Sequence, residues 1–226
     1  MTITWYGQSC FKIETRETIL AIDPFSKDIG LAPPRFHADL VLVTHQHHDH
    51  NNVAAISPRS PKDEGGGNKK DLTVIDGAGE YEIKGLAVTG ISTFHDSREG
   101  QDRGPNTVFR IEAEGIVMVH LGDFGESSLR EETLDALGNT DVLMTPVGGT
   151  YTIDGAAAAK VVNKIEPRIV IPMHYALAGL KIKLAPLENF LKEYGVPGLE
   201  RLDKLSLKKK DLPEEAKVVI LKAQGS

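Results

Sequence analysis

Residues 44–50, with the sequence THQHHDH, place four histidines and one aspartate directly after a run of apolar residues. Imidazole nitrogens and carboxylate oxygens bind divalent metals, so a strand that ends in this cluster predicts a metal site. His45 and His47 are two residues apart, which puts both rings on one side of an extended segment. Asp49 and His50 lie beyond that pair, where the chain must turn, and can reach a second metal nearby. The alternative is a solvated histidine tract, which the internal and interrupted cluster disfavours.

Four further apolar segments end in a residue that can bind a metal or accept a hydrogen bond. These residues are Asp23 after 19–22, His95 after 90–94, His120 and Asp123 after 117–119, and His174 after 170–173. A polar group that interrupts a core segment costs free energy unless it has a charged or metallic partner. One such residue is usually a histidine that is satisfied within the core. Five strand ends of this kind in one chain favour a shared site.

Together these residues resemble the metallo-β-lactamase superfamily, over nearly the whole chain and in the expected order. The superfamily has a strand-end Asp, a His-x-His-x-Asp-His motif, a lone His, a bridging acid and a late His, which correspond here to Asp23, residues 45–50, His95, Asp123 and His174. The second motif is highly specific, and the others are persuasive together. Within the superfamily the chain is similar to the branch that contains ascorbate-6-phosphate-lactonase-like proteins and uncharacterised metal-dependent hydrolases, through residues 3–11, 23–25, 120–123 and 171–175.

The resemblance implies two divalent metal ions. The first would be held by His45, His47 and His95, the second by Asp49, His50 and His174, and both by a bridging Asp123. Each ion then has four protein ligands and shares a position for a water or hydroxide. Asp23 would orient a ligating imidazole by accepting its other N–H. His120 is the alternative to His95 at the first metal or a donor behind the ligands, and we favour His95. Zinc is the expected metal, and manganese or iron also fits nitrogen and oxygen ligands.

The charge of such a centre predicts its chemistry. Two divalent cations carry four positive charges, and Asp49 and Asp123 neutralise two of them. The pKa of a bridging water should fall from about 15.7 towards roughly 7, so that metal-bound hydroxide is the nucleophile. Asp49 is the predicted catalytic residue, because it can orient that water and pass on its proton. The remaining positive charge favours an anionic substrate or transition state. We therefore predict a dinuclear-metal hydrolase that cleaves a phosphodiester, a lactone or a related ester.

Two other functions use the same ligands. A metal-dependent nuclease acting on RNA or DNA is chemically equivalent, but the sequence has no long basic arm or inserted clamp domain. A non-catalytic metal-binding scaffold or sensor also needs ligands, although a full ligand set favours catalysis. His95 lies in the sequence FHDS and not in the Thr-Pro-Gly-His setting of glyoxalase II and many lactamases. That difference disfavours a lactamase or thioesterase.

Candidate substrate contacts come from residues near the predicted ligands. Tyr151 follows the flexible corner 148–150, and Tyr175 follows His174, so either hydroxyl could donate to a developing oxyanion. A tyrosine that is simply packed or exposed is the alternative at both positions. Residues 97–104 include Arg98 and Arg103 and could form a mobile rim that binds a phosphate, although solvated charge is the usual state of such a loop.

The elements that must position these residues are strands in the first half and alternating strands and helices in the second. Strands are expected at residues 2–6, 10–14, 19–22, 40–44, 72–75, 80–83, 86–89, 107–111 and 116–119, then at 141–144, 168–171 and 216–222. Helices are expected at 51–56, 126–137, 156–165 with Asp154 as N-cap, and 184–194 with Pro186 in the first turn. Residues 58–70 are a predicted surface loop. This order indicates an α+β fold, the four-layer αββα sandwich of metallo-β-lactamases, with residues 1–226 as a single domain.

The composition indicates which class of protein and which kind of substrate this chemistry belongs to. The chain has 226 residues, of which 40% are hydrophobic and 26% charged, as in an ordinary globular protein. The net charge of −6 disfavours broad binding to a nucleic-acid backbone, so a small anionic or ester substrate is the preferred partner. A homo-oligomer is compatible with this composition. The single cysteine, Cys10, excludes an intrachain disulfide, the N-terminus does not resemble a signal peptide, and no apolar run approaches the roughly 20 residues of a membrane span. We therefore expect a cytoplasmic protein without a membrane partner.

Overall fold

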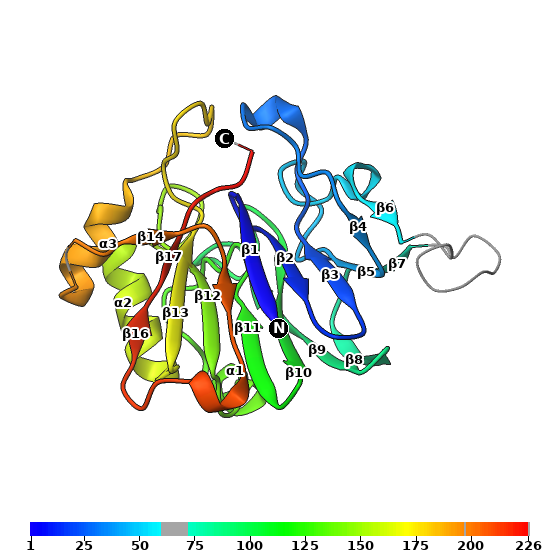
Figure 1. The fold of residues 1–226 in the computed structure, drawn as a ribbon. Coiled ribbons are helices and arrows are strands. Elements are labelled where there is room, and N and C mark those ends of the chain that lie inside the picture. Colours follow the sequence, from blue (N-terminus) through cyan, green and yellow to red (C-terminus); the bar gives the residue numbers. More distant parts are fainter. Residues whose placement is uncertain (60–71, 197, 226) are drawn as a thin grey trace.

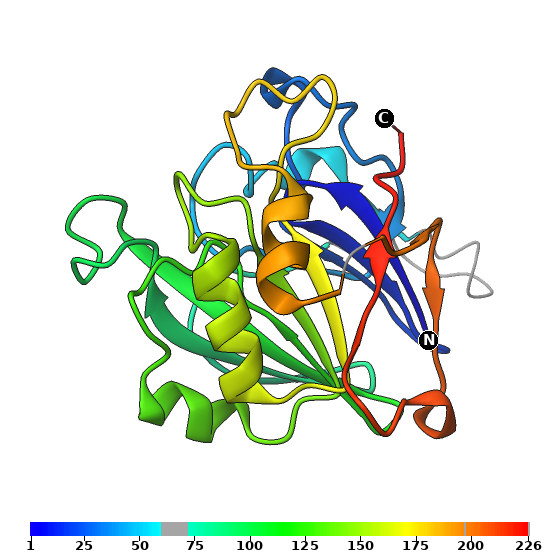
Figure 2. The same cartoon turned by 90° about the vertical axis from the view of Figure 1, so that its left-hand side faces the viewer.

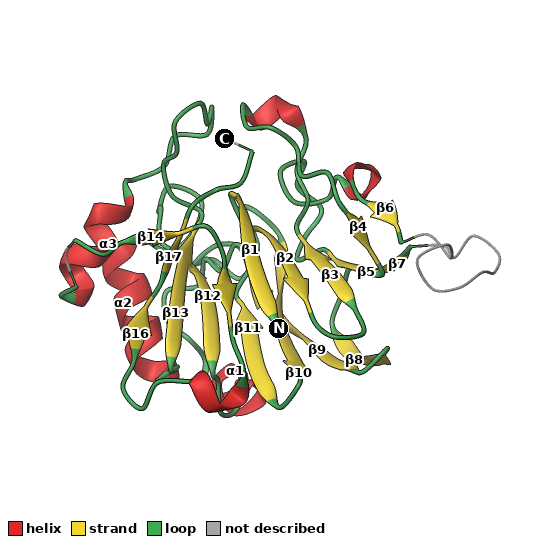
Figure 3. Cartoon of the chain, in the orientation of Figure 1, coloured by secondary structure: helices red, strands yellow, loops and turns green. Residues whose placement is uncertain are grey.

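The computed structural model describes residues 1–59, 72–196 and 198–225, which form two mixed sheets with flanking helices (Figures 1 and 3). The strands of the first sheet are β1 (Thr2–Gly7), β2 (Cys10–Glu14), β3 (Ile19–Ile22), β5 (Leu40–Leu42), β7 (Thr73–Ile75) and β15 (Leu205–Ser206). Those of the second are β8 (Gly79–Ile83), β9 (Leu86–Phe94), β10 (Pro105–Ala113), β11 (Ile116–His120), β12 (Val142–Pro146), β13 (Ile169–Met173) and β16 (Lys217–Val218). Two short pairs join β4 (His37–Ala38) to β6 (Ser57–Pro58) and β14 (Arg201–Leu202) to β17 (Ile220–Leu221).

The strand order brings several carboxyl ends to one edge of the molecule. The first sheet has the order β15-β1-β2-β3-β5-β7, and the second has the order β16-β13-β12-β11-β10-β9-β8. Strands β3, β5 and β7 are parallel to one another, as are β11, β12, β13 and β16. Strand β9 is antiparallel to β10, which is antiparallel to β11, so β9 and β11 end on the same side. The residues that follow these strands therefore lie close together in space.

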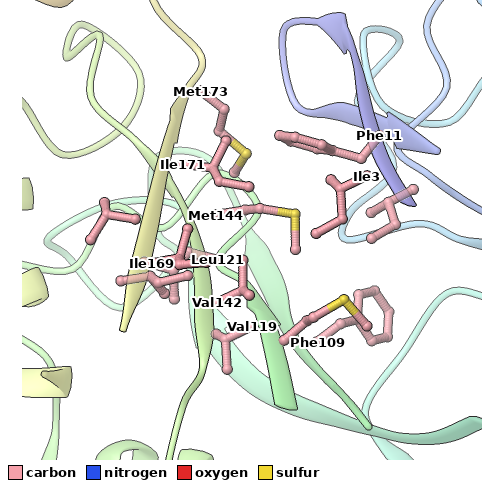
Figure 4. Close-up of a cluster of buried hydrophobic side chains, with 14 of the residues drawn as sticks. Ile3, Phe11, Phe109, Val119, Leu121, Val142, Met144, Ile169, Ile171 and Met173 are labelled. Carbon is pink, nitrogen blue, oxygen red and sulfur yellow. The ribbon is translucent and has the colours of Figure 1, made fainter. Parts of the chain in front are cut away.

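The hydrophobic core fills the space between the two sheets. Ile3 and Phe11, from the first sheet, face Met144 and Ile171, from the second (Figure 4). Each of these side chains is fully buried. Strands such as β12 and β13 are buried at every position, as expected for parallel strands covered on both faces.

The outer faces are covered unequally. Helices α1 (Glu131–Leu137) and α2 (Gly155–Ile165) contact strands β9 and β12 of the second sheet, and α3 (Leu187–Tyr194) packs against α2. In Figure 2, α2 and α3 lie in front of the strands. On the other face of the first sheet, Val41 and Val43 pack against Ala38 and Ile56. The 3₁₀ turns η1 (Lys27–Ile29) and η2 (Val53–Ala55) lie in this part of the chain, and η4 (Lys209–Asp211) lies near the C-terminus.

The predicted α+β fold is confirmed. The turn η2 takes the place of the short helix that was expected at 51–56.

Several predicted boundaries differ from the structure, and a long-range contact explains the difference at α1. Helix α1 begins at Glu131 instead of 126, since the Glu126 carboxylate accepts the Phe94 N–H and pairs with Arg130. Helix α3 begins at Leu187, which leaves Pro186 as its N-cap instead of in its first turn. The strand expected at 216–222 is divided into β16 and β17, which pair in different sheets. Asp154 caps α2 as predicted, accepting the Ala157 N–H.

The predicted loop at 58–70 lies almost entirely outside the described residues. Within the part that the structure describes, no helix is long and apolar enough to cross a membrane.

Candidate metal centre

The predicted ligands follow strands of both sheets and meet at the shared edge. Residues 45–50 follow β5 in the first sheet, whereas His95, Asp123 and His174 follow β9, β11 and β13 in the second. Three groups have ligand atoms that all lie within 4.8 Å of one another: His45, His47 and His95; Asp49, His50 and His174; and His45, His50 and Asp123. The first two groups match the two ligand sets that the resemblance implies. The third joins them through Asp123.

One carboxylate oxygen of Asp123 is the point on which three imidazoles converge. Asp123 Oδ2 lies 3.3 Å from His50 Nε2, 3.2 Å from His95 Nε2 and 3.2 Å from His174 Nε2. Burial alone would raise the pKa of Asp123, but His174 and His50 hold it well below its usual range. An ionised oxygen facing imidazoles of both groups has the position that a bridging metal ligand requires.

His45 provides a test of whether the site fits a metal. Its Nε2 is buried and has no hydrogen-bond partner among the described residues, which is costly for a polar atom in a protein interior. Burial, and then the neighbouring His50, lower the pKa of His45 to about 2, so the ring is neutral. A buried neutral imidazole with a free nitrogen inside a group of histidines fits a divalent metal ion.

Asp23 holds two of the candidate ligands in place, as the resemblance implies. Its Oδ2 accepts a hydrogen bond from His50 Nδ1 at 2.9 Å and another from the Thr44 hydroxyl at 2.7 Å. Because the Thr44 hydroxyl donates to Asp23, its oxygen accepts the Nδ1–H of His45 at 2.9 Å. Asp23 thus fixes the ring of His50 directly and that of His45 through Thr44, and both Nε2 atoms are left to face the site.

Sequence reasoning missed the turn between β1 and β2 as part of the site. Gln8 donates from Nε2 to Asp49 Oδ2 at 2.9 Å, and the Ser9 hydroxyl donates to Asp123 Oδ1 at 3.3 Å. Asn106 also contributes, because its Oδ1 accepts the backbone N–H of Asp123 at 2.9 Å. The available signal was a pair of polar residues, Gln8 and Ser9, between two strands with an otherwise apolar face. Both residues are fully buried.

His120 lies behind the ligands, in agreement with the preference for His95, whereas the position of Tyr175 corrects an expectation. Both nitrogens of His120 are already used: Nε2 donates to the Ser9 carbonyl at 2.9 Å, and Nδ1 accepts the Gly122 N–H at 3.1 Å. His120 therefore supports the turn at Ser9 and does not replace His95. Tyr175 was a candidate substrate contact, but it is 1% exposed and packs against Trp5 with ring centroids 5.1 Å apart. Tyr175 is a core residue that does not reach the site.

A pocket of about 580 Å³ opens over the candidate ligands. Five ligands line it: His47, Asp49, His95, Asp123 and His174. Its remaining lining residues are Asp28, Ile29, His48, Arg103, Tyr151, Lys181, Ile182 and Lys183. Tyr151 is 39% exposed and is the predicted substrate contact that the structure does bring to the pocket. The volume is within the range of small-molecule sites.

Comparison with known proteins places this geometry in a family. Residues 2–174 match the family model described as "Beta-lactamase superfamily domain". A UPF0173 metal-dependent hydrolase of Thermoplasma acidophilum is 33% identical, over 77% of this chain and 83% of the relative. Another from Methanopyrus kandleri is 29% identical, over 77% of this chain and 84% of the relative.

Solved structures agree. A candidate zinc-dependent hydrolase of the metallo-β-lactamase superfamily from Thermotoga maritima has 35% identity and a TM-score of 0.77, with 97% of each chain covered. A metallo hydrolase from Ignicoccus hospitalis, at 22% identity with a TM-score of 0.63 over 97% of this chain and 94% of that one, shares the fold. The match to the family model and the identity with these relatives agree with the cluster of ligands at the strand ends. The chain therefore belongs to the metallo-β-lactamase superfamily and, within it, to the UPF0173 metal-dependent hydrolase family.

Proposed function

We propose that this protein is a dinuclear-metal hydrolase that cleaves a phosphodiester, a lactone or a related ester. The observation that carries the proposal is the convergence of His50, His95 and His174 on Asp123 Oδ2, because it joins two ligand groups through one oxygen. His45, His47 and His95 would hold one ion, Asp49, His50 and His174 the other, and Asp123 both. The name of the Thermotoga relative supports zinc as the metal.

Two bound divalent ions would supply Lewis acidity and a hydroxide nucleophile at neutral pH. Asp49 is the residue of this chain that lies best for proton transfer. It lines the pocket, and its Oδ2 accepts from Gln8 and lies 3.4 Å from His50 Nε2. Burial would raise the pKa of Asp49, but the charge of His50 and its hydrogen bond lower it, which keeps the carboxylate ionised. An ionised carboxylate at the pocket wall can orient a water and accept its proton.

The size and charge of the pocket support a small anionic substrate. A volume of about 580 Å³ suits a metabolite-sized ester, and the chain's net charge of −6 gives no general attraction to nucleic acid. The sequence similarity to ascorbate-6-phosphate-lactonase-like proteins makes a phosphorylated lactone the first compound class to test. A nuclease activity is the alternative with the same chemistry.

The test is an assay of the zinc-loaded protein against bis-p-nitrophenyl phosphate, a lactone panel and labelled RNA. We expect turnover of an ester or lactone, and its loss in His174→Ala together with loss of one bound metal. His37→Ala is the control, since His37 is exposed in β4 and is absent from the ligand groups. Full activity of His174→Ala would contradict the proposal. Inactivity of the wild type on all three substrates would favour a metal-binding scaffold.

A further inference from the structure

The loop that follows His95 is held in one shape by a single carboxylate. Asp96 Oδ1 accepts the backbone N–H groups of Arg98 at 2.7 Å and Gly100 at 3.0 Å. Asp96 Oδ2 accepts those of Asp102 at 3.1 Å and Arg103 at 2.8 Å. Four backbone donors on one buried side chain give residues 96–104 a fixed shape, although the loop projects from the ends of β9 and β10 (Figure 2). A loop built in this way can present a side chain at a fixed position.

Arg103 is the side chain that this loop brings to the pocket. Its guanidinium carbon lies 4.7 Å from the centre of the Tyr151 ring, and its Nη2 donates to the Thr150 carbonyl at 3.4 Å. Within the described part of the chain, Arg103 forms no ion pair with a carboxylate. Arg98 of the same loop differs, because it pairs with Asp102 at 2.9 Å and does not line the pocket. An arginine stacked on an aromatic ring, with donors left over, is suited to binding an anion.

Two lysines line the same pocket from a different segment. Lys181 and Lys183 lie between β13 and α3, and the backbone N–H of Lys181 donates to the Ile29 carbonyl at 2.8 Å. Neither ammonium group is in an ion pair with a residue that the structure describes. The carboxylate that lines the pocket outside the ligand groups is Asp28, which accepts from the Ser26 hydroxyl. The rim therefore carries three cations and one carboxylate, in a chain whose net charge is −6.

We propose that Arg103, stacked on Tyr151, binds a phosphate or carboxylate group of the substrate at a distance from the bond that is cleaved, with Lys181 and Lys183 adding positive charge. This inference rests on the proposed function and narrows it to small esters or lactones that carry a second anionic group. Such a group gains charge-assisted hydrogen bonds that a neutral analogue cannot form. A nucleic acid is disfavoured, because the cations line a small pocket and do not form an extended basic groove.

The first measurement is binding, which does not depend on turnover. Calorimetry on the zinc-loaded protein would compare phenylphosphonate with benzoate, which distinguishes a phosphate site from a carboxylate site. We expect Arg103→Ala to weaken binding of the preferred anion about tenfold or more, and Arg103→Lys to weaken it less. Arg98→Ala is the matched control, and its affinity should equal that of the wild type. Tyr151→Ala should weaken binding several-fold, because it removes the ring on which Arg103 is stacked.

The second measurement separates this inference from the proposed function. The same titrations are repeated on His174→Ala, which should lack one metal. If the anion site does not depend on that metal, Arg103→Ala should still weaken anion binding in this background. Absence of hydrolysis in the wild type together with Arg103-dependent binding would remove the proposed reaction and keep the anion site. Equal affinities for wild type, Arg103→Ala and Arg98→Ala would overturn the anion site. Stronger Arg103-dependent binding of a ten-nucleotide RNA than of either small anion would overturn the small-molecule class.

Discussion

The hydrogen bonds around Thr44 decide which nitrogen of His45 is free to bind a metal. The Thr44 hydroxyl donates to Asp23, so it accepts from His45 Nδ1 and leaves Nε2 as the lone-pair atom. Motif spacing predicted the histidines and Asp23, because those residue types at strand ends have few other uses. It could not predict the roles of Thr44, Gln8 and Ser9, because the hydrogen-bond partners of these uncharged residues depend on which strands meet.

Replacing Thr44 tests this chain of hydrogen bonds. Thr44→Val keeps the shape of the side chain but removes the acceptor for His45 Nδ1–H, so the ring can rotate or adopt the other tautomer. We expect zinc affinity to fall about 10- to 100-fold, measured by competition with a chelating dye. Thr140→Val, at a buried threonine far from the ligands, should leave the affinity unchanged. Equal zinc affinity in Thr44→Val and wild type would show that the threonine does not orient His45.

Tyr175 illustrates why sequence proximity to a ligand is a poor guide to contact. It follows His174, whose backbone is in the left-handed region with φ 52°, and its ring points into the core beside Trp5. Its hydroxyl is buried and finds no partner among the described residues. A buried hydroxyl without a hydrogen bond costs about 1–3 kcal/mol. Tyr175→Phe should therefore raise the free energy of unfolding by about 1 kcal/mol near neutral pH, measured by urea denaturation.

Tyr175 should also make the free energy of unfolding fall as the pH rises above 10. Burial raises the pKa of the Tyr175 hydroxyl above its ordinary value of 10.0. Above pH 10 the unfolded chain loses this proton while the folded chain keeps it, so stability falls by about 1.4 kcal/mol per pH unit. Tyr175→Phe should lack this component, and the stability difference between the two proteins should grow from pH 10 to pH 11. A constant difference over that interval would contradict the burial of an un-ionised hydroxyl.

At the scale of elements, the site depends on where strands end. The strand at 19–22 was predicted with its observed bounds, since a continuous apolar run followed by Asp23 marks a buried strand and its end. The start of α1 could not be predicted, because a long-range contact between Glu126 and the Phe94 N–H fixes it. Strands β4, β6, β14 and β15 have two residues each, which is too short for an alternating pattern.

The shape of the loop at 96–104 depends on the Asp96 carboxylate, which accepts four backbone hydrogen bonds. Asp96→Ala should therefore loosen the loop. Removal of the four hydrogen bonds to this carboxylate should speed hydrogen exchange at the amides of Arg98, Gly100, Asp102 and Arg103 by about tenfold or more, measured by mass spectrometry or NMR. Asp102→Ala is the control, because its side chain holds only the exposed pair with Arg98. Unchanged exchange in Asp96→Ala would show that the loop keeps its shape without this carboxylate.

At the scale of the whole molecule, the candidate ligands join the two sheets. His45, His47, Asp49 and His50 follow a strand of the first sheet, and His95, Asp123 and His174 follow strands of the second. Metal bound by both sets would stabilise the packing of one sheet on the other, in addition to the shared core. The sequence could predict two sheets and their ligands, but not that helices α1 to α3 cover mainly one of them. On the first sheet, Phe36, Ala38, Val53 and Ile56 pack against Val41 and Val43 instead.

Anomalous diffraction at the zinc edge, from crystals of the zinc-loaded protein, tests the dinuclear centre most directly. We predict two peaks in each chain, one among His45, His47 and His95 and the other among Asp49, His50 and His174, with the Asp123 carboxylate between them. A single peak, or two peaks of which neither contacts Asp123, would contradict the account.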